Sequence, residues 1–170
     1  FLRFFPTLSK FCANALFLSL QSIDGLSYLP PTVTRIGLGR TKKRLSLKPL
    51  GHFTHLRQLF LEGQTKDIEV ISTLSTLISV TLRSITLPDL SILQPLTCLR
   101  ALDLKLGGTR DLALLPGIGE LDYLELWMIR GFNDLSPLSD LAHLNSLFLQ
   151  ALPQVQQLPD LSRLPHLETV

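Results

Sequence analysis

Cysteine, aromatic residues and charge are all sparse in this chain of 170 residues, and each shortage excludes a class of protein. Two cysteines are too few for a disulfide scaffold. Charged residues make up 18% and apolar residues 45%, which excludes intrinsic disorder, because disordered chains combine high charge with low hydrophobicity. No apolar run approaches the roughly 18–20 residues that span a bilayer. At typical lengths of about 100–200 residues per domain, the chain is expected to form one domain and no membrane contact is expected.

Acidic residues are nearly absent from the first part of the chain. Residues 1–60 hold nine Lys and Arg but a single acid, Asp24, whereas residues 61–170 hold seven Lys and Arg against thirteen Asp and Glu. The net charge of +2 therefore conceals a basic part and an acidic part. Residues 40–44, RTKKR, are the most basic stretch. They are interpreted as a solvated loop, with steering of an acidic partner or a nucleic-acid contact as the functional alternatives.

What the chain has in abundance is a repeated apolar pattern. Apolar residues recur every three positions in runs of five, and the spacing then drops to two. A representative run is Leu47, Leu50, Phe53, Leu56 and Leu59, followed by Leu61. The resulting L-x-x-L-x-L segments begin at residues 33, 56, 77, 99, 121, 144 and 167. Such a fixed period indicates a repeat architecture.

The two spacings predict two kinds of local structure. A spacing of two points alternate side chains inward, as in a β-strand. A spacing of three fits a 3₁₀-like or extended return, in which side chains i and i+3 share one face. A unit of about 22 residues cannot bury its leucines alone, so units must stack and share a continuous core. The pattern predicts a mostly β solenoid with parallel strands on one side.

The sequence resembles the leucine-rich repeat proteins, and its returns resemble the bacterial internalin-like class. The segments that carry the resemblance include DLSPLSDLAHL at 134–144 and DLSILQPL at 89–96. The resemblance implies an α/β-type, mostly β curved right-handed coil, with the parallel sheet on its concave face and 3₁₀ or irregular returns on its convex face. We expect a single leucine-rich repeat domain over 1–170, with an irregular N-terminal capping repeat at 1–32. Regular repeats are expected over 33–170 and are predicted to be cut short at the C-terminal end.

One feature of that family is missing. Its asparagine after the strand segment, which satisfies backbone groups of the turn, is absent from six units. The corresponding residues are Thr41, Gln64, Ile85, Gly107, Ile129 and Leu152. The backbone groups of these turns are therefore predicted to need other partners.

The pattern offers no catalytic or metal-binding constellation. His55, His143 and His166 occupy equivalent positions in different repeats, so they are not expected to converge on a metal ion. Cys12 and Cys98 are several repeats apart and are predicted to be free thiols. No nucleophile elbow or phosphate-binding glycine loop is present. The sequence thus predicts a protein that is not an enzyme and that needs no cofactor or metal.

The residues between the strand leucines are predicted to point away from the core. On the last strands they form an aromatic and charged cluster, which is typical of binding hot spots. The candidate partner-binding residues are Tyr123, Glu125, Trp127, Phe148, Asp103, Lys105, Arg83 and Phe60. The alternative is that Trp127 and Phe148 cover each other or pack beneath a flanking segment.

A solenoid without catalytic residues is most often a binding scaffold. The leading prediction is therefore a non-catalytic scaffold that recognises a protein partner through its concave face, as a bacterial binding or inhibitor protein of immunity type. The alternatives are a secreted or surface internalin-like adhesin and the substrate-recognition domain of a larger enzyme, such as an effector ubiquitin ligase. A cytoplasmic location is expected, with a secreted or surface location as the alternative. Nucleic-acid binding by residues 35–57 is the weakest alternative.

Overall fold

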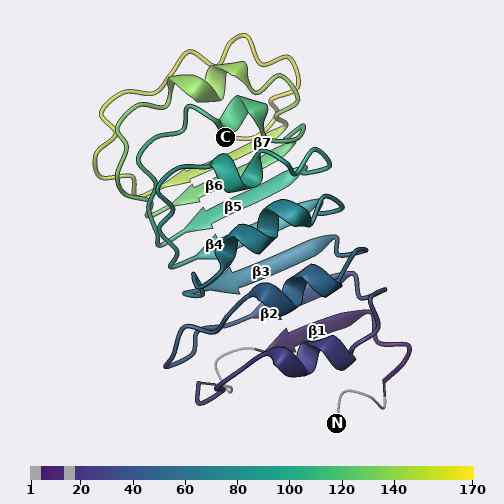
Figure 1. Cartoon of the computed structure of the whole chain (residues 1–170). Coiled ribbons are helices and arrows are strands. Elements are labelled where there is room, and N and C mark those ends of the chain that lie inside the picture. Colours follow the sequence, from purple (N-terminus) through teal and green to yellow (C-terminus); the bar gives the residue numbers. More distant parts are fainter. Residues whose placement is uncertain (1–4, 14–17) are drawn as a thin grey trace.

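A computed structural model describes residues 5–13 and 18–170 of the chain, and its strands form one open parallel sheet. The strands follow one another in chain order from one end of the molecule to the other (Figure 1). They are β1 (Lys10–Ala13), β2 (Arg35–Leu38), β3 (Gln58–Glu62), β4 (Ser79–Arg83), β5 (Ala101–Lys105), β6 (Tyr123–Trp127) and β7 (Ser146–Gln150). The predicted register is confirmed, because Leu59, Val80, Leu102, Leu124 and Leu147 are direct neighbours across the sheet.

Short 3₁₀ helices return the chain to the start of each next strand and cover one face of the sheet (Figure 1). They are η3 (Asp24–Tyr28), η4 (Lys48–His52), η5 (Ile68–Thr73), η6 (Ser91–Leu93), η7 (Leu115–Gly117) and η8 (Ser136–Asp140). None of the described helices is long and apolar enough to cross a membrane. The predicted mostly β leucine-rich repeat solenoid with 3₁₀ returns is thereby confirmed.

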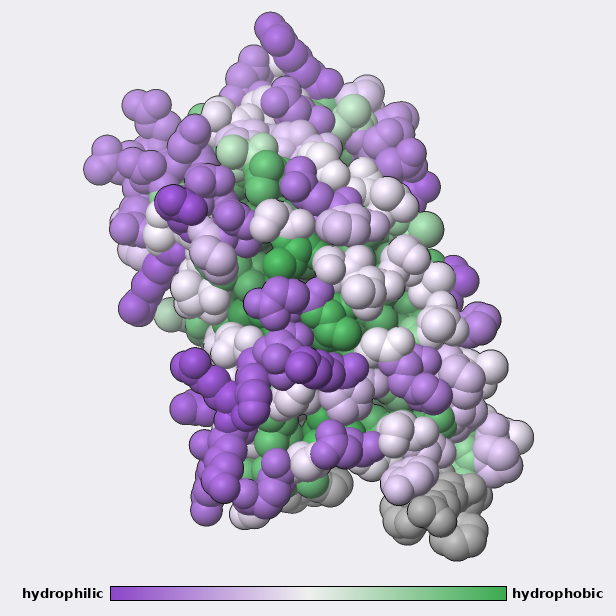
Figure 2. Space-filling model, viewed as in Figure 1, coloured by the Kyte–Doolittle hydropathy of each residue, from purple (hydrophilic) through white to green (hydrophobic). Residues whose placement is uncertain are grey.

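The three-residue spacing of the leucines coincides with the hydrogen-bond period of these returns. The backbone N–H of Phe53 donates to the carbonyl of Leu50 at 3.0 Å, and that of Leu50 donates to Leu47 at 2.9 Å. The same i to i−3 bonds link Leu99 to Leu96 and Leu96 to Leu93, each at 3.0 Å. Because i and i+3 eclipse in a 3₁₀ turn, all these side chains point into the core. Figure 2 shows this side of the molecule, where apolar patches remain visible between hydrophilic residues.

The first strand lies within the segment predicted as an irregular capping repeat. Leu8, Phe11 and Ala13 reproduce the L-x-x-L-x-L spacing, and Ala13 is buried. β1 pairs in parallel with β2, and Lys10 lies opposite Arg35. The strand was not recognised from the sequence because Phe and Ala occupy two of its three leucine positions. The structure therefore adds a strand before the first unit that the leucines mark. The last marked unit, which begins at Leu167, forms only an isolated bridge from Thr169 to Ser146.

The turns after the strands satisfy their backbone groups in two ways. In the third strand's turn the buried side chain of Gln64 accepts from the N–H of Leu45 at 3.0 Å and donates to the carbonyl of Gly39 at 3.1 Å. Further along, the turns bond to one another: Gly108 N–H donates to Ile85, and Arg130 N–H donates to Gly107. These hydrogen bonds supply the partners that the turn backbone groups were predicted to need in place of the family's asparagine.

Candidate functional site

The face of the sheet opposite the 3₁₀ returns, which we call the open face, carries all eight predicted binding residues. They alternate along the strands with buried residues such as Leu102 and Leu124. Their positions are Phe60 on β3, Arg83 on β4, Asp103 and Lys105 on β5, Tyr123, Glu125 and Trp127 on β6, and Phe148 on β7. The strand register brings seven of them together, whereas Phe60 lies on β3 between Gly37 and Thr81, nearer the N-terminal strands.

Lys105 is the centre of a polar network on the open face. Its Nζ lies 2.7 Å from Oε2 of Glu125 and 3.3 Å from Oδ1 of Asp103. Tyr123 donates its hydroxyl proton to Glu125 Oε2 at 2.9 Å, and Thr81 donates to Asp103 Oδ2 at 2.8 Å. Glu125 is only 8% exposed, so its charge depends on these partners. Three adjacent strands are thus connected by side chains that hold one another in place.

The network shifts the pKa values of its members in different directions. Burial and the neighbouring carboxylate of Glu125 raise the pKa of Asp103. Burial also acts to raise the pKa of Glu125, but hydrogen bonds from Lys105 and Tyr123 outweigh it and lower that pKa. Burial and the hydrogen bond to Glu125 raise the pKa of Tyr123 to about 12. At neutral pH the tyrosine therefore remains a proton donor to a charged glutamate.

Aromatic and cationic side chains flank this network. The Arg83 guanidinium carbon lies 5.7 Å from the centre of a Trp127 ring, which is within the range of a cation–π interaction. Arg83 Nε also lies 3.4 Å from Glu62 Oε1. Phe148, which lies opposite Glu125, is 44% exposed and leaves an apolar surface accessible. Trp127 lies opposite Lys105 on β5 and Gln150 on β7, and the Arg83 side chain lies over its ring.

Two contributors to the cluster were not among the predicted site residues. Thr81 fixes one oxygen of Asp103, and Glu62 pairs with Arg83. Both occupy the same outward strand positions as the predicted residues, so the repeat register alone places them on the open face. A selection of aromatic and charged residues overlooks Thr81, because Thr81 is neither. Glu62 is charged and follows Phe60 by two residues on β3, so its register was signal enough to include it.

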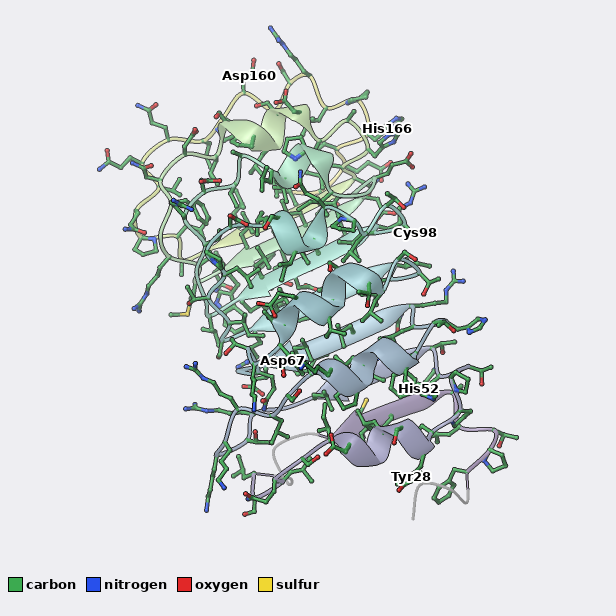
Figure 3. All side chains as sticks on the ribbon, viewed as in Figure 1. Tyr28, His52, Asp67, Cys98, Asp160 and His166 are labelled. Carbon is green, nitrogen blue, oxygen red and sulfur yellow. The ribbon has the colours of Figure 1, made fainter. Side chains whose placement is uncertain are left out.

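The histidines and cysteines do not form a site in the described part of the chain. Residues 5–13 and 18–170 contain no group of three or more His, Cys, Asp or Glu that is arranged to hold a metal ion. Cys12 and Cys98 are free and exposed. In Figure 3, His52 and His166 lie far apart along one edge of the molecule, with Cys98 between them. That the protein binds no metal stays a prediction, which a measurement of bound metal would test.

Comparison with solved structures supports the fold, whereas comparison of the sequence with known families and proteins finds no match. No family model matches the sequence, and no curated protein matches it. Among solved structures, internalin C2 of Listeria monocytogenes matches with a TM-score of 0.68 and 27% identity over 89% of this chain. A leucine-rich repeat protein of Leptospira interrogans matches with a TM-score of 0.64 and 22% identity over 86% of this chain.

A plant protein shares the same fold. The peptide hormone receptor RGFR1, solved in complex with RGF2, matches with a TM-score of 0.62 and 17% identity over 88% of this chain. The chain spans 66% of the internalin C2 chain, 38% of the Leptospira chain and 26% of the receptor chain. It therefore corresponds to part of each of these proteins, with which it shares its fold.

Proposed function

We propose that this leucine-rich repeat protein is a non-catalytic scaffold that recognises a protein partner through the open face of its sheet. The observation that carries the proposal is the cluster around Lys105, in which Trp127 and Phe148 flank a network of ordered charges. Aromatic side chains beside pre-ordered polar groups are the usual composition of a binding hot spot. The RGFR1 structure, a complex with RGF2, supports a protein or peptide as the ligand class for such a fold.

The order within the cluster favours binding over a purely structural role. Lys105, Asp103 and Glu125 are held by ion pairs within the free protein, so binding a partner costs little further side-chain entropy. Phe148 is 44% exposed in the absence of a partner, and its burial in a complex would be favourable. Rigid charges beside an uncovered aromatic ring are thus suited to an interface.

Three roles are compatible with this scaffold. We propose first the intracellular inhibitor of immunity type, because two free cysteines are compatible with a reducing compartment. An internalin-like adhesin at the cell surface is the second, supported by the likeness to internalin C2. Fractionation of the producing cells separates these two roles. Recognition of substrates for an enzyme is the third, and assays of the full-length gene product test it.

Site-specific crosslinking tests the proposal itself. A photoreactive benzoylphenylalanine replaces Ser146 on the open face or, as the control, the exposed Gln94 at the end of η6. Crosslinks in the producing cells to one defined protein are expected from position 146 and not from position 94. Equal crosslinking at both positions, or none at position 146, would contradict the proposal.

The crosslinked partner then serves to test the aromatic cluster. Trp127→Ala is expected to weaken its binding by about 2 kcal/mol or more, roughly thirtyfold, because the indole lies on the open face beside Arg83. Titration calorimetry measures the affinity, and a thermal melt verifies that the variant is folded. Gln94→Ala should leave the affinity unchanged. An unchanged affinity in a folded Trp127→Ala variant would remove Trp127 from the interface.

A further inference from the structure

We infer that the open face contains a second recognition site over β1–β4, which receives an apolar side chain of the partner together with a neighbouring carboxylate. The inference rests on the proposed function, since it assumes that a protein meets this face. The site is a hollow of about 370 Å³, at the lower end of the range of about 300–1,000 Å³ for ligand pockets. Its lining includes Cys12, Arg35, Gly37, Gln58, Phe60 and Ser79. It lies at the opposite end of the open face from Trp127 and Phe148.

The hollow exists because Gly37 has no side chain. Among the seven described strands only β2 has a glycine along the middle of the open face. From β1 and β3–β7 the residues there are Cys12, Phe60, Thr81, Asp103, Glu125 and Phe148. The backbone of Gly37 is not in the left-handed region, so its conformation does not require glycine. A Cβ at this position would meet Cys12 Sγ at 3.2 Å and the other nearby atoms at 3.7 Å or more. Glycine inside a strand commonly marks the close approach of a ligand or another backbone.

The charges at the hollow select an anionic partner. Arg35 lines it, and Lys10 lies directly opposite Arg35 on the neighbouring strand, at a strand spacing of about 4.8 Å. Within residues 5–13 and 18–170, no carboxylate forms an ion pair with either of them, whereas Arg83 pairs with Glu62 and Lys105 pairs with two carboxylates. Two adjacent cations without counter-charges repel each other, and a bound carboxylate relieves that repulsion.

The walls of the hollow select the rest of the ligand. Most of the lining is polar, but Phe60 lies on one side of Gly37 and Cys12 on the other, so one aromatic or aliphatic side chain can contact them above Gly37. A phosphate backbone would meet the cations but would make no use of the contacts that Phe60 and Cys12 offer. The occupant that satisfies both features is a protein segment in which Asp or Glu adjoins an aromatic residue. The basic character of residues 1–60 steers such a segment to this end of the solenoid.

Three labelled peptides test the site by fluorescence anisotropy: Ser-Glu-Phe-Asp-Ser, Ser-Lys-Phe-Lys-Ser and Ser-Glu-Ala-Asp-Ser. The first is expected to bind the wild-type protein at least tenfold more tightly than the other two. Gly37→Val fills the hollow from an outward strand position and should weaken the first peptide at least tenfold. Gly51→Val, on the exposed part of η4, is the matched control and should not weaken it. Thermal melts establish that both variants are folded.

A charge reversal provides a second readout. Arg35→Glu should abolish the preference for the acidic peptide, because the new carboxylate faces Lys10 and neutralises the remaining positive charge. Equal affinity for all three peptides, no binding up to about 1 mM, or an affinity that Gly37→Val leaves unchanged overturns the inference. A twelve-residue thymidine oligonucleotide that binds while the acidic peptide does not would also overturn it, in favour of nucleic acid. If the peptides fail while position 146 still crosslinks a partner, the proposed function stands and only this site is lost.

Discussion

Single residues at the strand ends determine how closely neighbouring repeats approach. Ser84, Leu106, Met128 and Ala151 each follow a strand and have φ between 51° and 56°, the left-handed region that costs L-residues about 1–2 kcal/mol. Gly107 follows Leu106 in one of these turns. It lies so close to the preceding repeat that a Cβ would be 1.9 Å from the carbonyl oxygen of Ile85. These turns are therefore tight because the backbones of adjacent repeats are in direct contact.

The substitution Gly107→Ala is expected to destabilise the protein by about 3 kcal/mol, because the methyl group collides with backbone that carries inter-repeat hydrogen bonds. Gly117→Ala is the matched control, since its Cβ would lie 3.5 Å from the flexible side chain of Gln94. That change should alter stability by less than about 1 kcal/mol. Urea unfolding measures both. Equal effects of the two substitutions would show that the Gly107 turn is more open than the structure indicates.

A second prediction at this scale concerns Tyr123, whose pKa of about 12 reflects burial and the adjacent Glu125 carboxylate. The chain has two tyrosines, so Tyr28→Phe leaves Tyr123 as the single phenol. Its ultraviolet titration is expected to have a midpoint near pH 12, and Glu125→Gln should lower that midpoint. The folded state holds this proton more tightly than the unfolded state, so the stabilisation is present below about pH 10 and is lost as the pH rises toward 12. A midpoint near 10, with the circular dichroism of the folded protein intact, would contradict the Tyr123–Glu125 bond.

At the scale of elements, each repeat consists of a strand and a 3₁₀ return that are stable only against their neighbours. The strand contributes alternate leucines, such as Leu102 and Leu104, and the return contributes every third one, such as Leu93 and Leu96. All of these side chains lie in one cluster that extends through every repeat. Since no repeat has a core of its own, damage to one strand removes the support of both adjacent repeats.

The substitution Leu102→Asp tests this dependence. Leu102 is fully buried between β4 and β6, and an unpaired charge there has no partner, so the variant is expected to be unfolded. Ala101→Asp places the same charge one residue away on the open face and should leave a folded protein. Far-ultraviolet circular dichroism with thermal melting distinguishes the two. A cooperative melt of Leu102→Asp close to that of the wild type would mean that the strand register is wrong.

At the scale of the whole molecule, the open face is electrically and chemically polarised from one end to the other. The N-terminal strands carry Lys10 and Arg35 around a hollow, whereas the later strands carry two carboxylates around Lys105 and exposed aromatic surface. A partner that binds both regions must therefore bind in one orientation along the sheet. The two regions meet at Thr81 on β4, which lines the hollow and donates to Asp103 of the Lys105 network.

The sequence by itself determined the repeat register, the strands β2–β7, their 3₁₀ returns and the face on which each binding candidate lies. These properties depend on which residues are apolar at spacings of two and three, and that pattern is local. Leu102 must point inward and Asp103 outward in any strand, whatever surrounds them. The same reasoning does not detect β1, because Phe11 and Ala13 lack the leucine signature although they fill the same positions.

Only the tertiary structure decided which outward residues interact. Lys105 pairs with Asp103 and Glu125, Arg83 lies over the Trp127 ring, and Gln64 bonds backbone groups of a turn that lacks the family's asparagine. The hollow at Gly37 also depends on Cys12 and Phe60 from the two neighbouring strands. Each of these contacts joins residues from different repeats, or depends on the conformation of long side chains. Composition and spacing do not encode such pairings, because the distance between two side-chain ends is settled only when the strands have stacked and the side chains compete for the same partners.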